Sequence, residues 1–294
     1  MTRRLRWLKT GTAYCETQRT VDRQFLLKPS KETRNIVGAC AGRALKKYPV
    51  KLFWLDVNIN HKHVGRAALS DSAEHLENLF RFDQLFNSLV TRELNRIYDR
   101  EGPLFSTRNR THEATDDSAL EQQLFYAVTN VVKDGLVDRV SHWEGVSSYN
   151  QLATGQVDTY TYIDRTAWHR AGGRHSKKPP EAFTKTVTLE LSPLPEWEHM
   201  SPGKRQAHFR REVRCQESAF REVREREGRT AMGRKKLAKV DPRDRPKTSK
   251  PKTRQPVCHS STFDYYASNL WMGGFWNVGF PSGSIRPPPL RVCT

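Results

Sequence analysis

The feature that most constrains the fold is an apolar stripe that recurs at helical spacing through residues 76–97. The stripe covers roughly six turns, and Gly102-Pro103 follows it as a stop signal. Such a stripe needs a large apolar surface to cover it. A chain of 294 residues has room for one sizeable core, with or without an appendage. The stripe consists of Leu76, Leu79, Phe80, Phe86, Leu89, Val90, Leu94 and Ile97.

Shorter patterns before this helix supply part of that surface. Residues 12–18 predict a short strand, and Ser30 offers an N-cap for a helix that Pro49 closes. The aromatic and β-branched run 52–59 predicts a buried strand. A turn at residues 58–60 then leads into a second strand that starts at His61.

The pattern continues beyond the long helix. Residues 104–111 predict a further strand, and Ser118-x-x-Glu121 is a capping box that starts a helix running to about Lys133. Gly135 is placed to end this helix in the left-handed conformation. The order strand, helix, strand, strand, helix, strand, helix predicts an α+β fold, a ferredoxin-like antiparallel sheet with helices on one face.

The same patterns divide the chain. We expect the α+β domain over residues 1–153 and a basic, partly helical accessory region over 154–240, with a strand at 184–191 and a helix at 202–229. Residues 241–256 predict a flexible Lys- and Pro-rich linker. Residues 257–294 form an aromatic and Pro-rich tail that we expect to dock on the body.

The charge of the chain points to a polyanionic partner. The net charge is +18, and residues 201–256 contribute +12 of it with 19 Lys and Arg against 7 Asp and Glu. Nucleic acid is the usual partner of such a chain. No run approaches the length of a membrane span. Five scattered cysteines without a C-x-x-C pair predict neither a disulfide framework nor a zinc ribbon, and indicate a reducing cytoplasm.

Two pairs of polar side chains carry the functional hypothesis. His61 and His63 are two residues apart on a predicted strand, so both imidazoles project from one face. Tyr126 and Asn130 are four apart on a predicted helix and also share a face. Taken separately, each pair also fits a purely structural interpretation. The histidines could be two outward polar residues of a strand, and the tyrosine could be a half-exposed residue of an ordinary amphipathic helix. If the helix crosses the strand, a divalent metal and a phenol lie side by side.

Those groups suit phosphodiester cleavage. A phenol with a pKa of about 10 is a poor nucleophile at neutral pH, and a metal ion on the phosphate offsets this by neutralising charge and orienting the attack. Two imidazoles and an amide oxygen, without thiolates, favour Mg²⁺ or Mn²⁺. Lys62 should point to the opposite sheet face from the histidines. The other histidines, His112 among them, show no ligand spacing and are expected to be structural or exposed.

Residues 60–149 resemble the single-tyrosine HUH transposases, and most closely the REP-associated tyrosine transposases of bacteria. Four segments carry the resemblance: Asn60-His61-Lys62-His63, Gly102-Pro103-Leu104-Phe105, the helix with Tyr126, Asn130, Val132, Gly135, Leu136 and Val137, and Trp143 with Ser147, Ser148 and Tyr149.

The resemblance implies a transposase that nicks and rejoins single-stranded DNA near a hairpin, in the bacterial cytoplasm and associated with the nucleoid. Tyr126 would be the nucleophile, forming a 5′-phosphotyrosine, and His61, His63 and Asn130 would hold the metal. Phosphate contacts are expected from basic residues near the site: Arg19, Arg108, Arg110 and Lys133. A homodimer is compatible with the sequence, which leaves open whether the Tyr126 helix serves its own sheet or a partner's.

Three departures from the family pattern keep alternatives open. The family has a hydrophobic residue where this chain has Lys62 and a proline where it has Val131, and Gly65-Arg66 interrupts a normally apolar strand. A charge that faces a core is costly unless it is paired. The chain is therefore also compatible with a DNA-binding protein derived from such an enzyme that has lost cleavage, or with a general nucleic-acid-binding protein of similar architecture.

Overall fold

A computed structural model of the chain describes residues 8–106, 110–246 and 258–259. The predicted order of elements is present as β1 (Ala13–Arg19), α1 (Lys31–Lys47), β2 (Lys51–Val57), β3 (His61–Ala67), α2 (Ala73–Ile97), β4 (Arg110–Ala114) and α3 (Asp117–Lys133). The chain continues as α4 (Tyr149–Thr154), β5 (Asp158–Ile163), α5 (Arg165–Arg170), β6 (Thr184–Leu189), α6 (Pro202–Arg226), α7 (Gly233–Leu237) and the short β7 (Cys258–His259).

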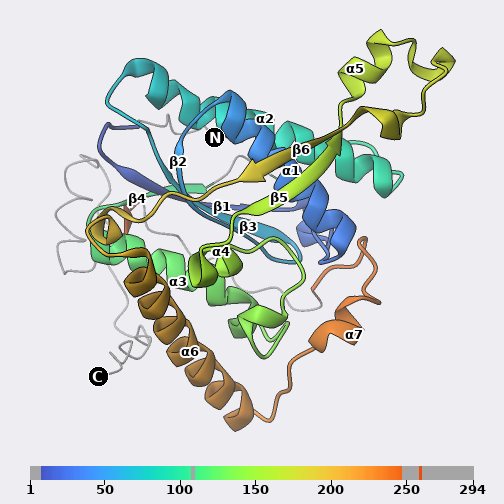
Figure 1. The fold of residues 1–294 in the computed structure, drawn as a ribbon. Coiled ribbons are helices and arrows are strands. Elements are labelled where there is room, and N and C mark those ends of the chain that lie inside the picture. The colour runs from blue at the N-terminus through green and yellow to red at the C-terminus, as the bar shows by residue number, and fades with distance from the viewer. Residues whose placement is uncertain (1–7, 107–109, 247–257, 260–294) are drawn as a thin grey trace, which may run out of the picture.

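The sheet has the strand order β2-β3-β1-β4, all antiparallel, and β7 extends it in parallel beside β4. This order, with α1 connecting β1 to β2 and α2 connecting β3 to β4, is the predicted ferredoxin-like arrangement. α1 and α2 pack together on one face of the sheet (Figure 1). α3 crosses the opposite face, where it contacts all four strands.

Alternating side chains of the strands divide the core between the two faces. Tyr14 and Leu55 belong to the cluster under α1 and α2, whereas Cys15 and Trp54 belong to the cluster under α3. The Trp54 ring lies against the backbone of Gly65, where an added Cβ would come within 2.3 Å of it. The glycine that interrupts the expected apolar strand therefore makes room for the indole.

The segment that follows α3 covers the β2 edge of the sheet. Trp143 donates its indole N–H to the carbonyl of Val57 at 3.0 Å. The hydroxyl of Ser148 accepts from the backbone N–H of Leu55 at 2.8 Å and donates to its carbonyl at 3.2 Å. These bonds satisfy backbone groups that an open edge strand would leave exposed, and they account structurally for the Trp-Ser-Ser segment of the sequence.

Two predicted boundaries are wrong. In the strand expected at 104–111, residues 104–106 form only an isolated bridge between Phe105 and Thr20, residues 107–109 lie outside the described ranges, and β4 continues to Ala114. The N-cap of α3 is Asp116 rather than Ser118, since the Asp116 carboxylate accepts from the N–H of Ala119 at 2.8 Å. Glu121 does not close a capping box and instead accepts hydrogen bonds from Trp197 and His208. Gly135 has the predicted left-handed conformation, with φ of 70°.

Elements after residue 153 pack on both sides of the core. The β5–β6 hairpin, of which only β6 was predicted, lies on α1 so closely that a Cβ at Gly38 would meet the Tyr160 ring at 2.3 Å. α6, predicted as 202–229, packs along α3 and α4 (Figure 1). Cys15 and Cys40 are buried free thiols.

Two sequence predictions fall largely outside the described residues, the linker from residue 247 onward and the aromatic tail. Within the described ranges, no helix has both the length and the apolar content to cross a membrane.

Candidate metal and tyrosine site

The two histidines of β3 and the asparagine of α3 converge on one point. The Nδ2 atom of Asn130 lies 3.0 Å from Nε2 of His61 and 3.0 Å from Nε2 of His63. The two imidazole centroids are 4.9 Å apart and nearly perpendicular. All three side chains are buried. The two histidine side chains of the strand and the asparagine side chain of the crossing helix thus lie together, as the sequence predicts.

Neighbouring side chains hold each imidazole by its other nitrogen. His61 Nδ1 is 2.8 Å from Oδ1 of Asn60, and because an amide oxygen can only accept, Nδ1 carries the proton. The lone pair of His61 then lies on Nε2, toward Asn130. His63 Nδ1 is 3.0 Å from the hydroxyl of Thr17 on β1. This outer contact is typical of histidines that ligate metals.

The electrostatic surroundings keep His63 neutral. Burial lowers its pKa to about 3, with further lowering from the positive charges of Arg19, Lys133 and Lys62. A neutral imidazole is the form that can donate a lone pair to a metal.

Tyr126 lies beside this group from the same chain. Its ring centroid is 5.6 Å from that of His63 at an interplanar angle of 90°, and its side chain is 39% exposed. Lys133 sits over the same ring, with Nζ 4.5 Å from the centroid. Partial burial raises the pKa of the phenol, Asp134 raises it further, and Arg19 opposes this. The phenol therefore carries its proton at neutral pH.

A cavity of about 230 Å³ opens between β1, β4 and α3 in front of these groups. Its lining includes His61, His63 and Tyr126, and also His112 and Gln123. The prediction that His112 is merely structural or exposed missed this placement. His112 pairs in register with Cys15 across β1 and β4, so only the sheet topology brings it to the site. Gln123 lies one turn before Tyr126 on the same side of α3.

The predicted phosphate contacts divide into three groups. Arg19 lines the cavity and Lys133 covers Tyr126. Arg110 begins β4 and pairs in register with Thr17. Arg108 lies outside the described residues.

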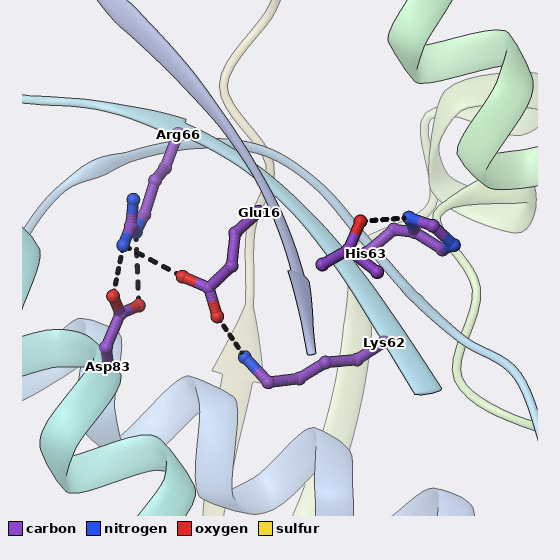
Figure 2. Close-up of polar contacts among 6 residues, drawn as sticks. Glu16, Lys62, His63, Arg66 and Asp83 are labelled. Atoms are coloured by element: carbon purple, nitrogen blue, oxygen red, sulfur yellow. Dashed lines mark hydrogen bonds and ion pairs between the residues drawn. The ribbon is translucent and has the colours of Figure 1, made fainter. Parts of the chain in front are cut away.

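Lys62 points to the opposite face of β3 from the histidines, as predicted (Figure 2). Its ammonium is 2.6 Å from Oε1 of Glu16, and Arg66 binds the other carboxylate oxygen at 2.9 Å. Arg66 also pairs with Asp83 of α2. We call Glu16, Lys62, Arg66 and Asp83 the buried ion network. Its two positive and two negative charges balance. Lys62 is therefore paired, and the free-energy cost expected of an unpaired lysine in the core does not arise.

The donor set decides which metal fits. In the described part of the chain, no three His, Cys, Asp or Glu side chains are grouped as metal ligands. A cation at the convergence point would therefore need amide oxygens in addition to the two imidazoles. Rotation of the Asn130 amide by half a turn would present Oδ1 in place of Nδ2. The resulting nitrogen and oxygen ligands suit Mg²⁺ or Mn²⁺ better than a closed zinc site.

Comparison with known proteins finds only weak structural similarity. No protein-family model matches the sequence, and no curated protein matches it. A REP-associated tyrosine transposase bound to a REP hairpin aligns with a TM-score of 0.41 and 17% identity, covering 53% of this chain and 87% of that one. A candidate transposase from Deinococcus radiodurans aligns with a TM-score of 0.30 and 12% identity, covering 42% and 95%. At these values the likeness assigns no role to any residue.

Proposed function

We propose that this protein is a metal-dependent transposase that nicks and rejoins single-stranded DNA through Tyr126. The observation that carries the proposal is the convergence of His61 and His63 on Asn130, with Tyr126 edge-on to His63. The arrangement places a phenol beside two imidazole lone pairs at an open cavity. The motif resemblance of residues 60–149 supports the same chemistry.

The proposed reaction is a transesterification. The hydroxyl oxygen of Tyr126 attacks the scissile phosphorus, the bond from phosphorus to the 3′ oxygen breaks, and a 5′-phosphotyrosine and a free 3′ hydroxyl result. The phenol loses one proton and the departing oxygen gains one, so the net proton count is unchanged. Attack by a 3′ hydroxyl on the phosphotyrosine reverses these steps and rejoins the strand.

Residues around Tyr126 would orient the substrate. His61, His63 and Asn130 would hold a Mg²⁺ or Mn²⁺ ion, which when bound neutralises phosphate charge and lowers the barrier to attack. Arg19 in the cavity lining and Lys133 over the Tyr126 ring place positive charge near the phenol, where the backbone of a DNA strand would pass.

The alternative, a DNA-binding protein without cleavage, drew support from Lys62 and Gly65. The pairing of Lys62 with Glu16 and the packing of Trp54 on Gly65 fit both residues into an intact strand. Neither residue displaces the histidines, so neither supports the loss of cleavage.

Covalent capture of DNA tests the proposal. Incubation with Mn²⁺ and labelled single-stranded hairpin DNA should give an adduct on a denaturing gel, and Tyr126→Phe should abolish it. Tyr162→Phe is a matched control, because Tyr162 lies on β5 near α1 and should leave the adduct unchanged. Hairpin binding without any adduct would support the non-cleaving alternative. Equal binding of hairpin and unstructured strands, unaffected by His61→Ala, would support a general nucleic-acid-binding protein.

A further inference from the structure

A second asparagine faces the metal-site histidines. Asn58 follows β2, and its backbone N–H donates to the carbonyl of His61 at 2.8 Å, which closes the turn between β2 and β3. Its side chain is 2% exposed, and Nδ2 lies 3.3 Å from Nε2 of His61. Its Oδ1 is buried without a hydrogen-bond partner.

The hydrogen bonding around His61 is therefore mismatched. Nε2 of a neutral imidazole protonated on Nδ1 has one lone pair, yet two amide nitrogens approach it, from Asn58 and from Asn130. The unpaired oxygen of Asn58 adds a penalty of about 1–3 kcal/mol. A buried polar group of this kind calls for a physical reason.

A cation removes the mismatch. When an amide rotates by half a turn about its Cγ, its oxygen takes the position of its nitrogen. With both amides rotated, a positive ion between them would meet two imidazole lone pairs and two amide oxygens. The oxygen of Asn58 would then have a partner, and neither amide nitrogen would compete for the lone pair of His61.

We infer that Asn58 is a fourth protein ligand of the metal site, through Oδ1. This inference rests on the proposed function, because it assumes that His61, His63 and Asn130 bind a divalent ion. Two nitrogens and two oxygens leave an octahedral ion open positions for phosphate oxygen and water. The added amide oxygen also shifts preference toward the harder ions, Mn²⁺ and Mg²⁺, which prefer oxygen ligands.

Mn²⁺ binding to the full chain without DNA tests the inference independently of catalysis. Free Mn²⁺ can be measured by its electron paramagnetic resonance signal to obtain Kd for each variant. Asn58→Ala should raise Kd by about tenfold or more, in the range seen when residues around a metal are removed. Asn58→Asp supplies an oxygen with negative charge and should bind at least as tightly as the wild type.

Asn87→Ala is the matched control. Asn87 lies on α2 and also has a buried Oδ1 without a partner, but α2 packs on the other face of the sheet. Its removal should leave Kd for Mn²⁺ unchanged. Thermal melting in excess chelator checks that Asn58→Ala is folded.

The outcomes separate the two proposals. If His61→Ala weakens Mn²⁺ binding and Asn58→Ala does not, the metal site stands and the role of Asn58 is overturned. If neither variant changes Kd, the metal site itself is wrong and both proposals fail. Should Asn58→Ala not fold, weaker binding by a folded Asn58→Asp would equally overturn the inference.

Discussion

Lys62 occupies the middle of the histidine motif, and its surroundings show how a strand can carry a charge there. Its ammonium lies 5.1 Å from the Phe86 ring centroid and 5.8 Å from that of Phe105, in addition to its ion pair with Glu16. Burial alone would raise the pKa of Glu16, but Lys62 and Arg66 outweigh it and lower that pKa to about 2. Glu16 therefore stays ionised and anchors both cations.

Removing one charged side chain of the buried ion network should lower the free energy of unfolding more than removing two side chains of opposite charge. Lys62→Met leaves an excess negative charge in the core, and we expect a loss of about 3–5 kcal/mol in the free energy of unfolding. Glu16→Gln leaves an excess positive charge and should also destabilise. The double variant keeps the Arg66–Asp83 pair balanced and should lose clearly less than the sum of the single variants.

Urea unfolding of the four proteins measures this coupling. Lys62→Met should not weaken Mn²⁺ binding, because the Lys62 side chain points away from His63 and its positive charge opposes a cation there. Strict additivity of the two substitutions would show that the network does not act as a unit.

For single residues, the sequence predicted which side chains share a face of one strand or helix. It did not predict contacts between side chains that are far apart in the sequence. The spacing of His61 with His63, and of Tyr126 with Asn130, follows from strand and helix periodicity. Glu16 lies 46 residues from Lys62, and His112 reaches the cavity only through its pairing with β1. Asn58 gave only a turn signal, since its contact with His61 depends on the register of β2 with β3.

Among the elements, α6 was predicted close to its observed bounds, but the buried charges on it were not. Its charged residues outnumber its apolar ones, yet two of the charged side chains are buried. Glu217 accepts from the backbone N–H of Val140 at 2.6 Å. Arg224 donates to the carbonyl of Val132 at 2.7 Å, and this carbonyl at the end of α3 also accepts from the backbone N–H of Gly135 at 3.0 Å.

The apolar contact of α6 with α3 centres on Phe209. This ring is fully buried and lies 5.8 Å from Phe125 of α3 and 5.9 Å from Tyr149 of α4, centroid to centroid. The contact holds α6 against the helix that carries Tyr126 and Asn130.

Phe209→Ala should therefore reduce the free energy of unfolding by about 3–5 kcal/mol. Val223→Ala is the matched control on the same helix, since Val223 is 46% exposed, and should change stability by no more than about 0.5 kcal/mol. Chemical denaturation of both variants gives the comparison. Similar small losses for the two would mean that α6 contributes little to the stability of the core.

For the whole molecule, the buried carboxyl of Asp56 contributes to the dependence of stability on pH. Asp56 of β2 accepts from the Ser147 hydroxyl at 2.7 Å and the Ser148 N–H at 3.1 Å through Oδ1, while Oδ2 is buried without a partner. Burial raises its pKa to about 6, although the serine bonds oppose this. The contribution of Asp56 is thus most favourable below its ordinary pKa of 3.8 and is lost as pH rises through about 6.

Asp56→Asn should remove this dependence while it keeps an oxygen for both serines. We expect the variant to be more stable than the wild type at pH 8, by on the order of 2 kcal/mol, and the difference to shrink toward zero near pH 4. Free energies of unfolding at pH 8, 6 and 4 measure it, with exposed Asp71→Asn as a control that should track the wild type. An advantage that grows on acidification would contradict the assignment.

The contact between Trp54 and Gly65 also limits how sequences of this kind can diverge. Any side chain at residue 65 would collide with the indole, and a smaller residue at 54 would leave a void beside the glycine. Substitutions at the two positions should therefore occur together, because a chain with only one of them would fold poorly. Relatives should show glycine with tryptophan, or a larger residue with a smaller one, and rarely a mixed pair.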